Sequence, residues 1–199
     1  MSTQNSVAVL GDTWVLRASN KTETLIRNIG LIVGLTAFTA ICAQVSIPLP
    51  FTPVPLTLQT FAVLGGAAAL GAERAVIAQG LYVGLIWLGL PIAAEHSGGS
   101  HVVYGATAGY LVGFIIASYL VGRMAQRGAS RNVLDTVAAF VVGSLAIYIV
   151  GVSWLSHVTS MTMREAIAAG MIPFLIGDFI KALAAGAVLP SAWNLTKSE

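Results

Sequence analysis

Apolar residues are gathered along the chain into six long runs, and short polar or glycine- and proline-containing segments separate these runs. A bilayer core about 30 Å thick needs roughly 20 apolar residues for each helix that crosses it. Each run is therefore predicted to form a membrane helix. The runs cover residues 29–47, 56–70, 75–90, 105–121, 136–155 and 172–189. The pattern predicts an all-α integral membrane protein, built as a six-transmembrane-helix bundle.

The second and third runs are short for helices that span a bilayer, and Glu73 and Arg74 stand between them. One continuous helix over residues 56–90 would place both charges at the bilayer centre, which is costly. The sequence therefore predicts a hairpin of two short helices, with Glu73 and Arg74 marking the polar turn.

The basic residues give the predicted bundle an orientation, because Lys and Arg are in excess in cytoplasmic loops. With the N-terminus inside, one basic residue, Arg164, falls on the outer face. Eight fall on the inner face: Arg17, Lys21, Arg27, Arg74, Arg123, Arg127, Arg131 and Lys197. Both termini are therefore predicted to be cytoplasmic. Residues 1–24 are predicted to form a polar cytoplasmic N-terminal tail, and residues 25–195 a single membrane domain.

This orientation places residues 46–55, 91–104 and 156–171 outside the membrane. The first of these segments leads into "FTPVPLTLQTF", residues 51–61, which carries Pro53 and Pro55 and no charge. Proline fixes its own backbone angle and disfavours helix in the residue before it. Non-helical backbone near a membrane is tolerated where it lines a cavity or is buried in protein. We therefore expect a well-shaped outer loop that leads into the second helix.

The composition agrees with a membrane protein and excludes an ordinary soluble domain. Hydrophobic residues make up 56% of the chain and charged residues 9%, whereas about a quarter of a soluble domain is charged. The chain is therefore expected to lie in a lipid bilayer. The net charge of +2 is small, so nothing in the charge favours a nucleic-acid partner.

The strongest chemical signal is the pair Asp178 and Lys181, which stand three apart in the apolar segment "PFLIGDFIKALAAG", residues 173–186. This spacing puts them on one helix face, close enough to pair. Ionisable groups inside a membrane are expensive and usually mark a functional site; the alternative is a structural ion pair that pins the helix. An acid and a base together suit a ligand with polar donors and an anionic group.

Other polar side chains are candidates for a binding pocket. Gln59 starts the second predicted helix and offers both a donor and an acceptor, for a ligand or for a neighbouring helix. Tyr82, Tyr104 and Tyr110 either line a pocket or belong to the aromatic belt at the membrane interface.

No metal site or catalytic motif is predicted. Glu95, His96 and His101 lie in one predicted outer loop, but the spacing of the histidines is not that of a helical ligand pair. The sequence has no phosphate-binding G-x-x-x-x-G-K-[ST] loop, and no H-E-x-x-H or G-x-S-x-G motif. The chain is therefore not expected to hydrolyse ATP by that motif, and no cofactor is predicted.

Small residues recur at fourfold spacing along the first predicted helix. Such faces let helices approach one another closely. They serve either packing inside the bundle or docking of a partner membrane subunit, and the sequence leaves both interpretations open. The pairs are Gly30 with Gly34, Thr36 with Ala40, and Thr39 with Ala43.

Four motifs together carry a resemblance to a known family. They are "PVPLTLQTFAVLGGAAALG", "YVGLIWLGLPI", "GATAGYLVGF" and "PFLIGDFIKALAAG", in that order. With them the chain resembles the BioY family over residues 29–189. Members of this family are biotin-specific substrate-binding (S) components of energy-coupling-factor (ECF) transporters. The resemblance implies a six-helix bundle in the cell membrane that binds biotin from the outside.

The resemblance also implies roles for individual residues. Pro53, Val54 and Pro55 would form a gating loop that helps to close the site, with Gln59 just behind it. Asp178 and Lys181, which match the family's G-D-x-x-K motif, would bind biotin.

The implied partners are a transmembrane coupling subunit and two cytoplasmic ATPases, which would supply the energy of uptake. The small-residue face of the first helix, at Ala37 and Ala40, would contact the coupling subunit.

The sequence departs from the family pattern in its outer loops. "GATAGY", residues 105–110, lacks the proline and the second glycine that the family often has there, and "LPIAAEHSGGSH", residues 90–101, has no arginine. His96, His101 or Tyr104 would then replace that arginine, or the ligand preference has shifted. The alternatives to biotin uptake are another vitamin or a biotin precursor as ligand, a membrane enzyme that uses Asp178, and a structural or channel-like protein.

Overall fold

The computed structural model of the chain describes residues 8–15 and 17–196. Residues 1–7 of the predicted tail, and Lys197 of the predicted inner face, lie outside the described residues. The helices and strands are α1 (Leu10–Val15), α2 (Lys21–Gln44), β1 (Ser46–Ile47), β2 (Leu56–Thr57), α3 (Gln59–Leu70), α4 (Ala72–Trp87), α5 (Ser100–Val103), α6 (Ala108–Gln126), α7 (Val133–Thr159), α8 (Met163–Gly170) and α9 (Leu175–Thr196). Short 3₁₀ turns at Ala94–His96, Ala129–Arg131 and Ile172–Phe174 complete the list.

The six apolar runs correspond to α2, α3, α4, α6, α7 and α9, with shifted boundaries. The largest shift is at α2, which begins at Lys21 and not near residue 29. Asn20 caps this helix, because its side chain accepts a hydrogen bond from the Glu23 N–H at 2.8 Å. A cap and a polar first turn extend the helix beyond its apolar part, so an apolar pattern alone underestimates its length.

Among the described residues, four helical stretches are long and apolar enough to cross a membrane: Lys21–Gln44, Ala108–Gln126, Val133–Thr159 and Met163–Thr196. The helices α3 and α4 are shorter, with 12 and 16 residues. They are separate helices, as the sequence predicts. The break between them falls at Gly71, whose φ of 82° favours glycine, so Glu73 and Arg74 lie in the first turn of α4.

Helix α6 lies at the centre of the bundle and packs against α7, α3 and α4. Two glycines allow this packing. A Cβ on Gly113 would lie 2.9 Å from the Cα of Ile147 in α7, and one on Gly122 would lie 2.4 Å from the Cα of Ala72 in α4. Helix α2 is peripheral, since 22% of the residues in its apolar stretch are buried, compared with 61% of those in α6.

The outer faces of the long helices are apolar. Ile176 of α9 is 76% exposed and Ile149 of α7 is 69% exposed, and Phe38 of α2 also lies on the surface. Exposed apolar area on this scale marks a surface that contacts lipid or another membrane protein. The core is therefore apolar and the exterior is apolar as well, as a bilayer environment requires.

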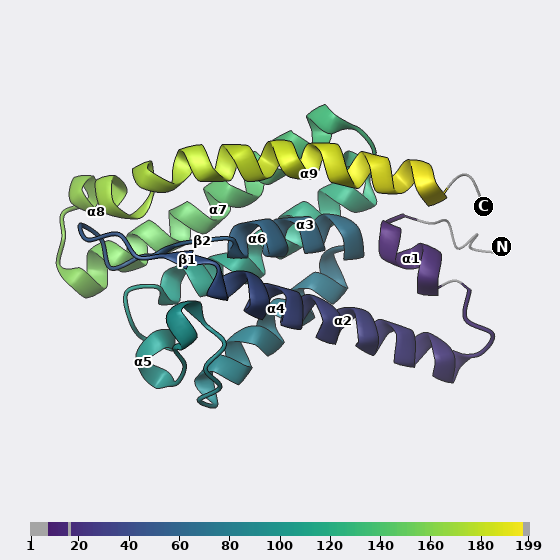
Figure 1. Cartoon of the computed structure of the whole chain (residues 1–199), viewed down its shortest axis with the longest axis horizontal. Helices are drawn as coiled ribbons and strands as arrows, with labels where there is room; N and C mark the ends of the chain where they lie inside the picture. Colours follow the sequence, from purple (N-terminus) through teal and green to yellow (C-terminus); the bar gives the residue numbers. More distant parts are fainter. Residues whose placement is uncertain (1–7, 16, 197–199) are drawn as a thin grey trace.

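The two ends of the bundle differ (Figure 1). The strands β1 and β2, together with α5 and α8, lie at one end, and α1 and the last turns of α9 lie at the other. The strands form a small antiparallel hairpin in which Ser46 pairs with Thr57 and Ile47 with Leu56. The expected non-helical loop therefore connects the two strands of a hairpin, and the pairing of the strands fixes both ends of the loop.

Helix α1 packs onto the end of the bundle opposite the hairpin. Val9, just before the helix, is fully buried, and Arg74 donates from Nη1 to Asp12 Oδ1 at 2.8 Å. Arg74 also donates from Nε to Asn28 Oδ1 at 2.7 Å. Residues 8–15 of the predicted tail are thus folded against the membrane domain.

Candidate functional site

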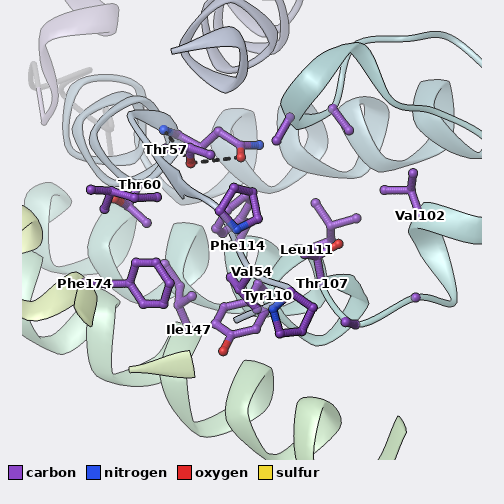
Figure 2. A pocket seen from close by; sticks show the side chains of 18 of the residues that line it. Val54, Thr57, Thr60, Val102, Thr107, Tyr110, Leu111, Phe114, Ile147 and Phe174 are labelled. Atoms are coloured by element: carbon purple, nitrogen blue, oxygen red, sulfur yellow. Dashed lines mark hydrogen bonds between the residues drawn. The ribbon is translucent and has the colours of Figure 1, made fainter. Parts of the chain in front are cut away.

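A cavity of about 260 Å³ lies at the end of the bundle that carries the β1–β2 hairpin. Its walls come from α3, α6, α7 and α9, together with the hairpin loop and the segment between α4 and α6. Tyr110, Phe114, Ile147 and Phe174 are among the side chains that line it (Figure 2). Most of the wall is therefore apolar, which is typical of a small-molecule site with a few polar groups that fix orientation.

The polar corner of the cavity is built on Asp178 and Lys181 of α9. The Lys181 ammonium donates to Asp178 Oδ1 at 2.9 Å, so the two side chains pair as their spacing predicts. Both side chains are largely buried: 12% of the Lys181 side chain and 10% of the Asp178 side chain is exposed. A buried ion pair needs further hydrogen bonds to offset its desolvation.

Two hydroxyl groups from other helices supply these hydrogen bonds. Thr60 of α3 donates to Asp178 Oδ1 at 2.9 Å and accepts from Lys181 Nζ at 2.8 Å. Tyr148 of α7 donates to Asp178 Oδ2. The polar cluster, defined here as Thr60, Tyr148, Asp178 and Lys181, therefore joins three helices at the cavity wall.

The polar cluster has capacity left for a ligand. A carboxylate offers about four acceptor positions, and the three donors of the cluster use three of them. An ammonium group has three N–H donors, and within the described residues the hydrogen bonds of Lys181 to Thr60 and Asp178 use two. The cluster can thus accept one further N–H at Asp178 and donate one further hydrogen bond from Lys181.

Thr60 and Tyr148 belong to the polar cluster but are not among the site residues that the sequence predicts. A signal existed for Tyr148, which is the single tyrosine of the run over residues 136–155. A buried phenol hydroxyl usually finds a hydrogen-bond partner. Thr60 gave no comparable signal, because an isolated threonine fits an apolar helix as well as a polar site.

Gln59 lies at the start of α3, on the cavity wall and largely buried. Its Oε1 accepts from Thr57 Oγ1 at 3.0 Å, as the dashed line in Figure 2 shows. Its Nε2 donates to Tyr82 Oη at 2.9 Å, and Tyr82 in turn donates to the carbonyl of Ile92 at 3.0 Å. Tyr82 is fully buried and is not among the residues that line the cavity. Tyr82 therefore fixes the Gln59 amide from outside the cavity wall.

The proline-rich segment reaches the cavity. Pro53, Val54 and Pro55 all line it, and Val54 is buried with 7% exposed. Prolines donate no backbone hydrogen bond, so this part of the wall has few donors of its own. The loop and Gln59 therefore line the same cavity.

The structure separates the three candidate tyrosines. Tyr110 lines the cavity and donates to the carbonyl of Gly170 at 2.8 Å. Tyr104 is 65% exposed and does not line the cavity. Tyr104 follows the last turn of α5. Val102, two residues earlier, lies on the buried face of this helix, so Tyr104 faces outward. The nearby Glu95 and His101 do line the cavity.

The small residues of α2 divide between two faces. Thr36 donates to the carbonyl of Ala78 at 3.0 Å, and Thr39 accepts from Gln79 Nε2 at 3.1 Å, so this face packs on α4. Ala37 is exposed, and Ala40 is partly buried against the core. An apolar groove, lined in part by Gly30 and Gly34, runs between α2, α3 and α9. Internal packing therefore accounts for one face, and the other carries the exposed Ala37.

Comparison with known proteins identifies the family. The BioY family matches residues 15–198 of the chain. The biotin transporter BioY of Thermotoga maritima is 38% identical over 164 residues, which are 82% of this chain and 92% of that protein. The probable biotin transporter BioY of Pyrococcus horikoshii is 33% identical over 159 residues, covering 80% and 91%. The chain belongs to the BioY family.

A solved structure shows the fold. The crystal structure of the S-component for biotin from an ECF-type ABC transporter superposes with a TM-score of 0.79, covering 89% of this chain and 95% of that one at 22% identity. The chain therefore has the helical fold of that S-component. Together with the apolar helices, this makes it a predominantly helical, multi-pass membrane protein.

Proposed function

We propose that the chain is the substrate-binding membrane subunit of a vitamin uptake transporter, which binds biotin from the outside. It is a transporter subunit and not an enzyme. The observation that carries the proposal is the polar cluster, a buried acid–base pair with capacity for one donor and one acceptor, set in an otherwise apolar cavity. Membership of the BioY family and the names of its relatives support biotin as the ligand.

The chemistry of biotin matches the cavity wall. Its ureido group offers N–H donors and a carbonyl acceptor, and its fused rings and alkyl chain are apolar. Asp178 accepts a ligand N–H, and the remaining N–H of Lys181 donates to a ligand oxygen. Phe114, Phe174 and Ile147 pack against the apolar parts.

The second polar group of the binding set is Gln59. It contacts the ligand directly, while Tyr82 acts through it by fixing its amide. Pro53, Val54 and Pro55 form the gating loop, which is supported by their place in the cavity wall. Tyr104 is left out of the binding set because it lies outside the cavity.

The proposed topology has six spans, formed by α2, α3, α4, α6, α7 and α9, with both termini in the cytoplasm of the cell whose plasma membrane holds the protein. Two observations support it. The inner face collects most of the basic residues, and α1 and the end of α9 lie at the same end of the bundle (Figure 1). The cavity lies at the opposite end, which then faces the outside.

The proposed partners are a transmembrane coupling subunit and two cytoplasmic ATPases. The coupling subunit contacts α2 at Ala37 and Ala40, beside the apolar groove. The ATPases supply the energy of uptake, since the sequence contains no phosphate-binding loop of the G-x-x-x-x-G-K-[ST] type.

A competition experiment tests the ligand. The purified protein in detergent is loaded with radiolabelled biotin, and unlabelled biotin, a biotin precursor or thiamine is added in excess. We expect saturable retention that unlabelled biotin displaces and thiamine does not. Displacement by the precursor alone would assign the site to that compound instead, and absence of any saturable retention by folded protein would refute the proposal.

A further inference from the structure

Gln44, the last residue of α2, makes more contacts to distant backbone than its place at a helix end requires. Its Nε2 lies 3.2 Å from the carbonyl oxygen of Ile92 and 3.1 Å from that of Ala93. It also lies 3.0 Å from the carbonyl oxygen of Ala40, one turn back in α2. Its Oε1 accepts from the backbone N–H of His96 at 3.2 Å. One side chain therefore ties the end of α2 to the segment after α4.

Only an amide fits this arrangement. The two N–H groups of Nε2 are shared among three carbonyl oxygens, and the single oxygen faces an N–H donor. The reversed amide would place its oxygen against carbonyls and its N–H groups against a donor, so the orientation of the side chain is fixed by its partners. A carboxylate at this position would repel the same carbonyl oxygens.

The segment that Gln44 holds, residues 92–97, is called the outer lid below. Ala93, Ala94, Glu95 and Ser97 of the outer lid line the cavity. Two of its residues have positive φ without being glycine, Glu95 at 58° and His96 at 53°. Such angles are rare and strained for residues with a side chain, and they persist where the surroundings impose them.

The outer lid has hydrogen bonds of its own. Ala93 N–H donates to the carbonyl of Ser97 at 3.0 Å, and Ser97 donates to that of Ala94 from its N–H at 3.2 Å and from its hydroxyl at 2.6 Å. Further support comes from outside, from Gln44 and from Tyr82, whose hydroxyl donates to the carbonyl of Ile92. Tyr82 is also the partner of Gln59 on the cavity wall. The hydrogen bonds thus run from the cavity through the outer lid to α2.

We propose that Gln44 is the positioning residue of the outer lid: it holds residues 92–97 in their strained shape over the cavity and links that shape to the position of α2. The proposal rests on the proposed function for its consequence, slow release of the ligand. Because α2 is the peripheral helix of the bundle, a small shift of its outer end lengthens all of these hydrogen bonds together and frees the outer lid.

The test compares the full-length protein with Gln44→Leu and Gln44→Glu. Hydrogen–deuterium exchange of the ligand-free protein measures the outer lid directly. We expect the amides of residues 93–97 to exchange at least tenfold faster in both variants, while those around Asp178 in α9 keep their wild-type rates. Stopped-flow binding of a fluorescent biotin derivative is expected to show dissociation about tenfold faster, with association not slowed.

The matched control is Gln126→Leu, which removes a glutamine amide at the opposite end of the bundle. It is expected to leave the exchange of residues 93–97 and the dissociation rate at wild-type values. Unchanged exchange in a folded Gln44 variant would overturn the proposal, as would a uniform rise over the whole protein. If the wild-type protein does not bind biotin, the proposed function fails, and the exchange comparison still decides the role of Gln44.

Discussion

Inside an apolar bundle, the Asp178 side chain is surrounded by hydrogen-bond donors from three helices. Thr60, Tyr148 and Lys181 each donate to it, from α3, α7 and α9. In surroundings of low dielectric constant such bonds are stronger than in water, and an unpaired polar group is correspondingly costly. The arrangement fixes the direction in which the carboxylate meets a ligand.

The role of Tyr148 is tested by Tyr148→Phe. The ring keeps its packing in α7, but Asp178 loses one donor, and the carboxylate becomes free to turn. Hydrogen bonds to charged groups contribute about 1.5–3 kcal/mol, so we expect biotin affinity to fall roughly ten- to hundredfold. The dissociation constant by equilibrium binding, with the midpoint of thermal unfolding, is the measurement.

The control for this variant is Tyr119→Phe, since Tyr119 is a half-exposed tyrosine of α6. It is expected to keep the wild-type affinity. An affinity of Tyr148→Phe equal to that of Tyr119→Phe would show that the tyrosine hydroxyl does not orient the carboxylate.

Single residues were predictable where their chemistry contrasts with their surroundings. Asp178 and Lys181 were found because charges stand out in an apolar run, and their pairing followed from their spacing. Tyr148 stood alone as a tyrosine in its run, but the partner of its hydroxyl could not be predicted, because Asp178 is on a helix distant in sequence. Tyr104 is the converse case: its residue type suits a pocket, but it follows α5 and is 65% exposed.

At the scale of elements, α6 determines how closely the helices around the cavity approach. The close contact of Gly122 with Ala72 brings α6 against the start of α4. The contact of Gly113 with Ile147 brings α6 against α7, which carries Tyr148. The glycines of α6 thus set the spacing of the scaffold on which the polar cluster is built.

Gly122→Ala tests this spacing. A Cβ at this position would meet backbone atoms of Ala72 at 2.3 Å and 2.4 Å, and backbone cannot move aside as a flexible side chain does. Overpacking of this kind typically costs about 1–3 kcal/mol, so we expect a lower midpoint of thermal unfolding in detergent.

Gly34→Ala in α2 is the matched control, because a Cβ there meets nothing within 4 Å. In a helix, alanine is favoured over glycine by about 1 kcal/mol, so this variant should unfold at or above the wild-type temperature. Equal midpoints for the two variants would contradict the central packing of α6.

The long elements could be predicted from hydropathy because each apolar run is long compared with the spacing between runs. The short elements could not be predicted. The strands β1 and β2 have two residues each and exist because the chain pairs with itself across a proline-rich connection. Helix α1 has six residues and is held by contacts such as that of Asp12 with Arg74. Such elements depend on tertiary contacts that no local pattern contains.

On the scale of the whole molecule, the structure is polarised. One end has a cavity with a buried acid–base pair, and the other is covered by α1 and carries most of the basic residues. A binding subunit needs this difference, because its ligand is captured on one side and its energy is supplied on the other. The sequence predicted the polarity through the distribution of Lys and Arg, but the cavity appeared only once the helices were packed.

A calorimetric titration of the purified protein with biotin, alongside Asp178→Asn and Lys181→Met, tests whether the polar cluster binds the ligand. We expect tight one-to-one binding by the wild-type protein, and a loss of at least a hundredfold in affinity in each variant that remains folded. Unchanged affinity in both variants would contradict this expectation, because the polar cluster would then be a structural ion pair and the ligand would bind elsewhere.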